Sequence, residues 1–253
     1  HMSIEAIMSS KQKNTTKKTI IMSETNRYTR QTMLPEIGEA GQQLLREAKV
    51  LLVGVGGLGS PIATYLTGAG IGTLGIVDDD VVSISNLHRQ VLYDEASVGL
   101  PKTDCARRRL HALNSEVTIH TYNTRLTADN AKDIISQYDI VIDGTDNFSV
   151  RFAISDACAA LGKPYIYGAI CGFEGQVAVL CKGKCTYRTL HPNESATISM
   201  PHPGKQVSGV TPAIVGSVEA NQALQIICQY GLPLIDRLWS IDLRTMQSFI
   251  IDL

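Results

Sequence analysis

Long apolar runs are missing from this chain of 253 residues, and no stretch approaches the roughly 18 residues that cross a membrane. An excess of either charge is missing too, because 23 Lys and Arg stand against 24 Asp and Glu, a formal net charge of −1. We therefore expect neither a membrane nor a nucleic acid as partner. The six cysteines are scattered through apolar stretches, which argues against a disulfide framework at this size. With 44% hydrophobic residues, the composition is that of a globular protein and excludes wholesale disorder.

The first 22 residues differ in composition from the rest. They carry four lysines against one glutamate and are rich in Ser and Thr. They lack the apolar segment of a secretory signal peptide. We expect a flexible N-terminal extension over residues 1–22, a single domain over residues 23–253 and a reduced, cytoplasmic protein.

Apolar runs of strand length alternate with segments of helix length as far as residue 169. Strands are expected at residues 49–53, 73–77, 117–122, 139–142 and 164–169. Helices are expected at residues 39–47, 60–69, 101–113, 128–137 and 148–161. This alternation predicts an α/β fold with a Rossmann-like, doubly wound and mainly parallel sheet.

The pattern changes in the last third of the chain. Residues 176–180, 238–243 and 248–251 resemble strands joined by short turns, which predicts an antiparallel extension of the same sheet. Residues 191–208 contain three prolines and no clear periodicity, so we expect a loop there. Residues 212–230 are expected to form a helix that carries Pro in its first turn.

A glycine-rich turn follows the first predicted strand. Gly54, Gly56 and Gly59 form the pattern Gly-x-Gly-x-x-Gly, with Gly57 inside it. Glycines here permit a tight turn and a close approach of the backbone to phosphate, and the helix start adds N–H donors. Asp78 ends the next strand, where an acid commonly binds a ribose hydroxyl. The pattern predicts a nucleotide site but does not choose between NAD and ATP, and glycines that serve only packing are the alternative.

Further polar groups follow the other strands. Asn86, Arg89 and Gln90 lie beyond the second strand, Lys102 begins a helix, and Asp146 follows the fourth strand. Ligands of such sheets bind beyond the carboxyl ends of the strands, so we expect these groups to converge there. Cations can stabilise a departing phosphate, and a carboxylate can hold Mg²⁺. The set favours metal-bound ATP, although each charge taken alone is more simply a solvated surface residue.

Six short motifs stand in order along residues 26–253. They are Arg27-Tyr-Thr-Arg30-Gln, Gly54-Val-Gly-Gly-Leu-Gly59, Asp78-Asp-Asp80, Ser85-Asn86-Leu-His-Arg89-Gln90, Gly99-Leu-Pro-Lys102 and Asp143-Gly-Thr-Asp146-Asn147. Together they resemble the ThiF/MoeB/HesA family of adenylating enzymes, relatives of the ubiquitin-activating enzymes. The resemblance implies an adenylyltransferase (a nucleotidyltransferase) that uses ATP and Mg²⁺. Its implied partner is a ubiquitin-like sulfur-carrier protein ending in Gly-Gly, whose terminal glycine carboxylate becomes an acyl-adenylate while pyrophosphate leaves, in thiamine or molybdopterin biosynthesis.

The resemblance also implies a role for each matching residue. The implied nucleotide-binding residues are Gly54, Gly56, Gly57, Gly59, Asp78, Asp80, Asn86, Arg89, Gln90 and Lys102. Among them, Asp78 would bind ribose, and Asn86, Arg89 and Lys102 would contact phosphates. The implied catalytic residues are Arg30, Arg89, Lys102 and Asp146. Asp146 would hold Mg²⁺, and Arg30 would reach ATP from the other subunit of a homodimer.

Two family features are missing from the sequence. Many members bind zinc through two Cys-x-x-Cys pairs, but Cys181 and Cys185 are not spaced as such a pair and no second pair follows before Leu253. Adding His191 and His202 gives a widely spaced set, so no zinc site is expected. Residues 203–209 also lack the loop cysteine with which some members take up the carrier. We therefore expect an enzyme that stops at the acyl-adenylate, and a substitute thiol at Cys171, Cys181 or Cys185 is the alternative.

Three other functions fit parts of the sequence. An NAD-dependent Rossmann oxidoreductase explains the glycines and Asp78, but not Arg89, Lys102 and Asp146 together. An enzyme like the tRNA threonylcarbamoyladenosine dehydratases would act on RNA, although the chain has no overall basic charge. A scaffold that binds a nucleotide without turnover would not need the charged set.

Overall fold

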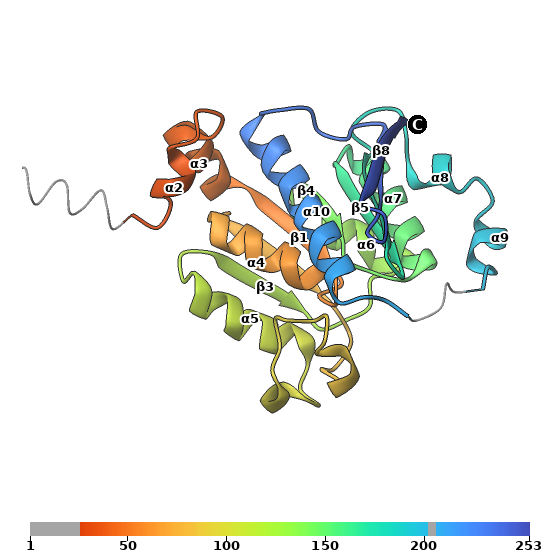
Figure 1. The fold of residues 1–253 in the computed structure, drawn as a ribbon, viewed down its shortest axis with the longest axis horizontal. Helices are drawn as coiled ribbons and strands as arrows, with labels where there is room; N and C mark the ends of the chain where they lie inside the picture. Colours follow the sequence, from red (N-terminus) through yellow and green to blue (C-terminus); the bar gives the residue numbers. More distant parts are fainter. Residues whose placement is uncertain (1–25, 202–205) are drawn as a thin grey trace, which may run out of the picture.

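The computed structural model describes residues 26–201 and 206–253, which are built around one eight-stranded sheet. Its spatial order is β3-β2-β1-β4-β5-β6-β7-β8 (Figure 1). The strands are β1 (Lys49–Val53), β2 (Thr73–Val77), β3 (Thr118–Tyr122), β4 (Ile140–Asp143), β5 (Tyr165–Cys171), β6 (Glu174–Leu180), β7 (Arg237–Asp242) and β8 (Gln247–Asp252). β1 to β5 pair in parallel, and β6, β7 and β8 add antiparallel pairs. The predicted fold class is confirmed.

Helices cover both faces of this sheet (Figure 1). One face carries α4 (Gly59–Ala69), α5 (Lys102–Leu113) and α10 (Val210–Cys228), with α3 (Gly38–Glu47) beside α10. The other face carries α6 (Ala128–Ile135) and α7 (Phe148–Leu161). The short elements are α2 (Thr29–Thr32), α8 (Tyr187–Leu190), α9 (Glu194–Ile198) and the 3₁₀ turns η1 (Ile84–Asn86) and η2 (Glu95–Ser97). In the part of the chain that the structure describes, no helix is both long and apolar enough to cross a membrane.

The central strand β1 shows why an unbroken apolar run forms a buried parallel strand. Val50 and Leu52 belong to the core between the sheet and α4, whereas Leu51 and Val53 belong to the core on the opposite face. All four side chains are buried. A strand covered by helices on both faces needs apolar residues in both directions, so it does not alternate with polar residues. Each such burial contributes about 1.5–3 kcal/mol of hydrophobic stabilisation.

Three short helices correct the predicted pattern. The segment expected to be a loop, residues 191–208, contains α9, which starts where the Asn193 side chain accepts a hydrogen bond from the backbone of Ala196 at 3.0 Å. α8 and α2 also lie in segments for which no helix was predicted. Helices of four or five residues are too short to produce a periodic pattern, so local capping is the sequence signal for α8 and α9, and the N-cap residue of α2 makes no side-chain cap. The extension predicted for residues 1–22 lies outside the described residues.

Candidate nucleotide-binding site

The site lies where the chain order of the sheet reverses. β1 and β4 are neighbours in parallel, but the chain continues from β1 outward to β2 and from β4 outward to β5. Doubly wound sheets bind ligands in the crevice at such a switch point. Val53 pairs with Asp143 and with Val77, so the residues after β1, β2 and β4 emerge at the same level. These strand ends carry most of the predicted residues.

The glycine turn between β1 and α4 is closed so tightly that side chains are excluded. Gly54 has φ +85°, a left-handed conformation that favours glycine. A Cβ on Gly59 would lie 2.2 Å from the carbonyl oxygen of Gly54. α4 starts without a side-chain cap and without an acidic residue in its first turn. Its N–H groups and positive dipole end therefore suit an anion such as phosphate.

Asp78 and Tyr93 hold this turn from the side of β2. Asp78 Oδ2 accepts a hydrogen bond from the backbone N–H of Val55 at 2.8 Å, and its Oδ1 accepts one from the N–H of Asp80 at 2.9 Å. The Tyr93 hydroxyl donates to the carbonyl of Val55 at 2.7 Å. Burial raises the pKa of Asp78, and Lys102 together with the two backbone donors opposes that rise. Asp78 thus fixes the loop and stands at the position where a ribose hydroxyl would bind.

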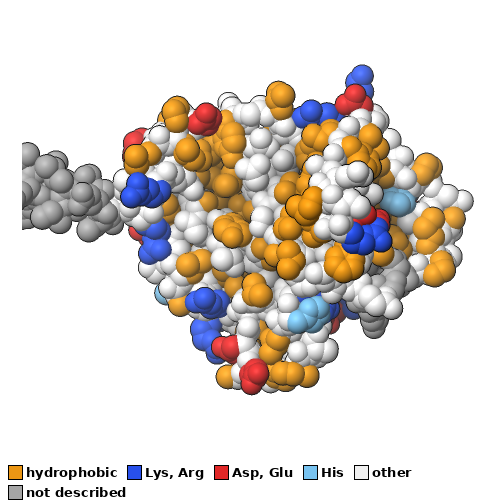
Figure 2. Space-filling model, viewed as in Figure 1, with side chains coloured by type: hydrophobic (Ala, Val, Ile, Leu, Met, Phe, Trp, Pro, Cys, Tyr) orange, Lys and Arg blue, Asp and Glu red, His pale blue; other side chains and the backbone are white. Residues whose placement is uncertain are grey.

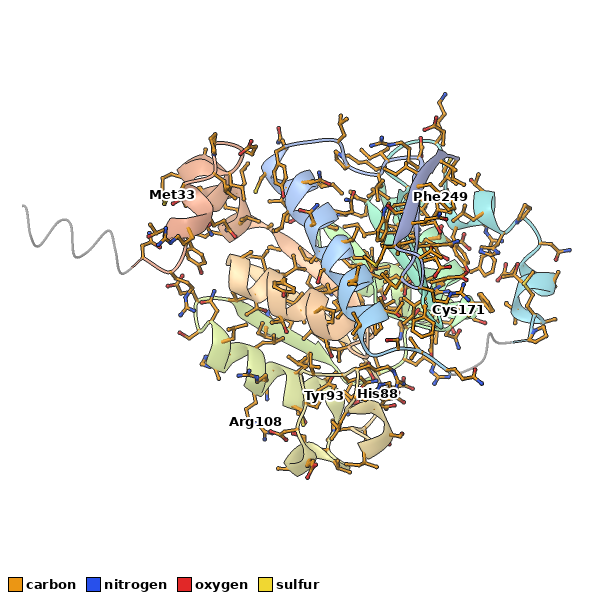
Figure 3. All side chains as sticks on the ribbon, viewed as in Figure 1. Met33, His88, Tyr93, Arg108, Cys171 and Phe249 are labelled. Carbon is orange, nitrogen blue, oxygen red and sulfur yellow. The ribbon has the colours of Figure 1, made fainter. Side chains whose placement is uncertain are left out.

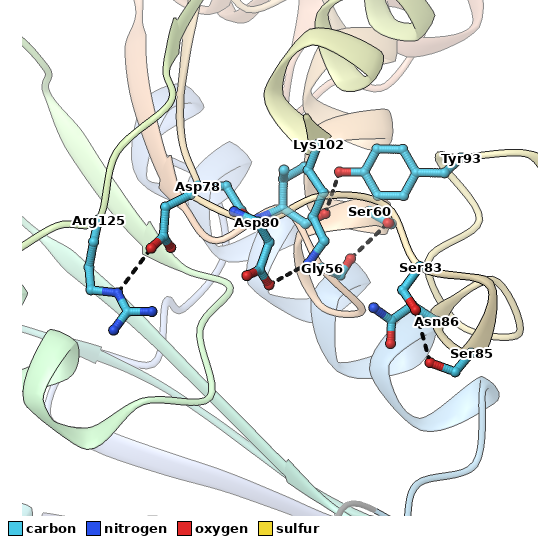
Figure 4. A network of polar contacts seen from close by, with 12 residues as sticks. Gly56, Ser60, Asp78, Asp80, Ser83, Ser85, Asn86, Tyr93, Lys102 and Arg125 are labelled. Carbon is cyan, nitrogen blue, oxygen red and sulfur yellow. Dashed lines mark hydrogen bonds and ion pairs between the residues drawn. The ribbon is translucent and has the colours of Figure 1, made fainter. Parts of the chain in front are cut away.

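Lys102 is buried at the first residue of α5. Its amino group donates to Asp80 Oδ2 at 2.9 Å, while the Asp80 side chain remains 65% exposed (Figure 4). An ammonium has three protons to donate, and this ion pair uses one. Asp78, Asp79 and Asp80 have carboxylate oxygens within 4.8 Å of one another. Lys102 therefore enters the site beside a strongly acidic strand end.

Asn86, the last residue of η1, and Arg89 just after it are joined by a hydrogen bond. The guanidinium of Arg89 donates to Asn86 Oδ1 at 3.0 Å and to His88 Nε2 at 2.8 Å. A Cβ on Gly57 would lie 3.5 Å from Arg89 Cδ, so the arginine lies against the glycine turn. Gln90 is buried, and its amide nitrogen would lie 3.3 Å from a Cβ on Gly56. The structure thus brings Asn86, Arg89 and Gln90 to the glycine turn.

Asp146 lies on the turn after β4, and its side chain is exposed. The preceding Gly144 joins this turn to the glycine turn, because its N–H donates to the carbonyl of Val53 at 2.7 Å. A Cβ on Gly144 would lie 2.2 Å from the carbonyl oxygen of Gly54. Asp146 therefore follows, two residues later, a segment that packs directly against the glycine turn.

Arg30 is not brought to this edge within one chain. It is exposed on α2, which is fastened to the far end of α4 where Gln31 Nε2 donates to the carbonyl of Ala69 at 3.0 Å. α4 is about 16 Å long at 1.5 Å per residue. Figure 3 shows Met33, next to α2, at the upper left, whereas His88 and Tyr93 lie near the bottom of the view.

Sequence reasoning missed several buried polar residues near the site. Arg151 Nε donates to Asp143 Oδ2 at 2.9 Å, and both side chains are buried. Glu219 of α10 is fully buried against Gly168, where a Cβ would lie 2.3 Å from its carboxyl carbon. The one available signal was a charge inside a largely apolar helix: Glu219 is the lone charge of α10, and Arg151 shares α7 with Asp156.

The cysteines differ in access. Cys171, at the end of β5, is exposed, whereas Cys185 is buried and Cys181 half-buried. Burial raises the pKa of the Cys181 and Cys185 thiols. Within residues 26–201 and 206–253, the one group of three or more potential metal-binding side chains is Asp78, Asp79 and Asp80. His202 lies outside the described residues, so the expectation of no zinc stays a prediction.

The surface agrees with the balanced composition. On the face shown in Figure 2, Lys and Arg side chains are scattered around the rim with acidic side chains among them, and apolar and neutral groups cover most of the centre. That face offers no broad basic area.

The fold and the strand-end residues define a doubly wound α/β protein with a phosphate-binding type of loop at its switch point. Within that class the chain belongs to the ThiF family, which its sequence matches over residues 28–253. The resemblance stated from the six motifs is confirmed.

Two curated relatives are similar over most of the chain. It is 46% identical over 219 residues to the sulfur carrier protein adenylyltransferase of Thermus thermophilus, covering 83% of this chain and 80% of that protein. It is 44% identical over 216 residues to a probable molybdopterin-synthase adenylyltransferase of Porphyra purpurea, covering 84% of this chain but 56% of that longer protein. The crystal structure of E. coli MccB with ATP shares the fold with a TM-score of 0.78 at 22% identity, covering 91% of this chain and 72% of that one.

Proposed function

We propose that this protein uses ATP to adenylate the C-terminal carboxylate of a ubiquitin-like sulfur-carrier protein that ends in Gly-Gly. A carboxylate oxygen forms a bond to the α-phosphorus, the bond from that phosphorus to the bridging oxygen breaks, and pyrophosphate leaves. The nucleophile is already ionised at neutral pH, so the reaction needs no general base. The observation that carries this proposal is Arg89 packed against the glycine turn in a chain of the ThiF family. Lys102 follows β2 and Asp146 follows β4, the two strands on either side of β1.

The main chemical obstacle is charge repulsion, because a carboxylate must approach a polyphosphate. Arg89 lies against the glycine turn and would contact phosphate oxygens, with Asn86 holding its guanidinium. Lys102 would share its remaining protons with phosphate while it keeps Asp80 as a partner. Preorganised cations of this kind stabilise the charge that collects on departing pyrophosphate. Asp78 would bind the ribose.

The donor set fits magnesium. Asp146 offers an exposed carboxylate beside the glycine turn, and hard oxygen ligands are those that Mg²⁺ prefers. When bound, the ion would neutralise phosphate charge. Asp146 would hold it from the protein side, which leaves room for phosphate oxygens and water as the other ligands.

A homodimer would complete the site. Arg30 is exposed and fixed at the end of the chain's own α4 that is remote from the glycine turn. A second subunit that offers the same α2 across the interface would bring Arg30 to ATP. This arrangement makes each site depend on both chains.

The pathway and the fate of the adenylate complete the proposal. The names of the two relatives support a sulfur carrier as substrate, and one of them names molybdopterin synthase. We propose molybdopterin or thiamine biosynthesis as the pathway and the cytoplasm as the location. We propose that the enzyme stops at the acyl-adenylate without zinc. A DTT-sensitive enzyme–carrier adduct that Cys171→Ala abolishes would contradict this, since Cys171 is the exposed cysteine of the described residues.

ATP–pyrophosphate exchange tests the activity. We expect exchange with one or more Gly-Gly carriers and none without a carrier. Thermal-shift titrations with Mg-ATP and NAD provide the control, because selective stabilisation by NAD would favour an oxidoreductase. Exchange driven by RNA in place of a carrier would favour the tRNA-modifying alternative.

A further inference from the structure

Thr145 lies between a buried ion pair and the glycine turn. It follows Gly144 on the turn after β4 and directly precedes Asp146.

The ion pair is rigid. Asp143 is fully buried, and its Oδ2 accepts hydrogen bonds from Arg151 Nε and from the Tyr165 hydroxyl, both at 2.9 Å. Arg151 also donates to the carbonyl of Gly168 at 3.1 Å, which ties the pair to β5. Buried charges with this many partners have little freedom to move.

Thr145 joins that pair through three hydrogen bonds. Its backbone N–H and its hydroxyl both donate to Asp143 Oδ1, at 2.8 Å and 2.7 Å. Its carbonyl accepts from Arg151 Nη2 at 2.8 Å. The hydroxyl bond is the one of the three that depends on the side chain.

The same side chain contacts the glycine turn. A Cβ on Gly54 would lie 3.1 Å from the Thr145 methyl carbon and 2.8 Å from the carbonyl group of Gly144. The methyl group therefore closes one side of the glycine turn while the hydroxyl is held by Asp143. Rotation of this side chain would move both contacts together.

We propose that Thr145 is a positioning residue whose hydroxyl, held by Asp143, sets the place of Asp146 relative to the glycine turn. This inference rests on the proposed function, because it assigns Asp146 to Mg²⁺ and the turn to phosphate. Thr145 itself touches neither the metal nor the substrate. It acts by fixing the distance between the two groups that do.

Two variants separate the hydroxyl from the methyl group. Thr145→Val keeps the shape and the methyl contact but removes the hydroxyl donor, whereas Thr145→Ser keeps the donor and loses the methyl group. We expect Thr145→Val to need at least about tenfold more Mg²⁺ for half-maximal pyrophosphate exchange. We also expect kcat to change more than KM for ATP, because the binding groups remain while their alignment is lost. We expect Thr145→Ser to stay within about threefold of wild type.

Thr197→Val is the matched control. Thr197 is buried in α9, where its hydroxyl donates to the carbonyl of Asn193 at 2.8 Å, so this change removes a similar bond away from the site. Its Mg²⁺ dependence should equal that of wild type. An unchanged Mg²⁺ dependence in Thr145→Val, or an equal change in Thr145→Ser and Thr145→Val, would overturn the proposal.

Calorimetry distinguishes the failure of this proposal from the failure of the proposed function. If no carrier supports exchange in wild type, the activity is wrong, and the affinity for ATP is then measured against Mg²⁺ concentration. Weaker Mg²⁺-dependent binding in Thr145→Val alone would support the positioning role. Equal affinities, or no Mg-ATP binding by wild type, would overturn it.

Discussion

Glu219 is the most unusual single residue of the structure. Both of its carboxyl oxygens are buried without a hydrogen-bond partner among the described residues. The charged groups that affect the pKa of Glu219 are Asp143 and Arg151. The pKa of Tyr167 responds to the same three groups. Burial raises the pKa of Glu219 well above its usual value, and Asp143 raises it further, against the opposing effect of Arg151. Burial therefore favours the protonated, neutral carboxyl of Glu219 in the folded protein.

This charge state predicts a pH dependence of stability. The pKa of Glu219 is higher in the folded than in the unfolded protein. Below about pH 4.5 the residue is protonated in both states, so it does not lower the free energy of unfolding. As the pH rises from there toward the folded pKa, the free energy of unfolding falls by about 1.4 kcal/mol per pH unit. Glu219→Gln removes this titration. Urea unfolding over a pH series that starts near 4.5 should show the variant gaining on wild type as the pH rises. A constant difference over the whole series would refute a raised pKa.

Arg89 and Lys102 carry the second prediction at this scale. Arg89→Ala and Lys102→Ala should each lower pyrophosphate exchange by about 10²-fold or more, close to 2.7 kcal/mol of transition-state stabilisation, because each removes a cation from the phosphates. Lys102→Met retains the buried stem and separates lost charge from lost packing. Arg188→Ala serves as the control, since Arg188 pairs with Asp156 and Glu194 on the surface. If a folded Arg89 or Lys102 variant shows full pyrophosphate exchange, the role assigned to that residue is wrong.

At the scale of the element, α4 contains its own matched pair of glycines. Gly59 starts the helix where a Cβ would lie 2.2 Å from the Gly54 carbonyl oxygen, whereas nothing lies within 4 Å of a Cβ on Gly68. We expect Gly59→Ala to abolish the Mg-ATP thermal shift, since backbone must move. We expect Gly68→Ala to raise the free energy of unfolding by about 0.5–1 kcal/mol and to leave binding intact. Normal ATP binding by Gly59→Ala would show that the turn tolerates a side chain.

The regular elements follow from local pattern more closely than the site does. β1, β2 and α7 have the predicted bounds, because each is a short apolar run or a strong helix segment between clear breakers. α9 was missed, because its signal is the single capping residue Asn193. Except for Arg30, the residues that were predicted for the site either lie in the glycine motif or follow a strand of the parallel sheet.

The buried contacts of Asp143 and Glu219 were not predicted, for a physical reason. The partners of Asp143 come from residues 145, 151 and 165, and a sequence does not state which strand or helix will face which. Glu219 depends on Gly168, fifty-one positions earlier, for the space that it fills. Such pairs are created by tertiary packing, so no local pattern encodes them.

At the scale of the whole molecule, Arg30 and the glycine turn lie at opposite ends of α4. A homodimer with shared sites predicts that Arg30→Ala and Asp146→Ala chains, each inactive alone, recover activity when mixed. In a mixed dimer one of the two sites contains both wild-type residues, so random exchange should restore about a quarter of the wild-type rate. Analytical ultracentrifugation supplies the mass. A fully active monomer, or no recovery in verified mixed dimers, would contradict the shared site.

The most direct test of the proposed adenylation is to look for the acyl-adenylate on the carrier. Intact-mass spectrometry of Gly-Gly-ending carriers, incubated with the protein and Mg-ATP, should show the addition of one AMP to at least one of them. The addition should vanish when the terminal glycine is removed, when ATP is omitted and in the Arg89→Ala variant. If a correctly folded protein that binds Mg-ATP adds AMP to no carrier in a panel covering the thiamine and molybdopterin pathways, the proposed adenylation is contradicted.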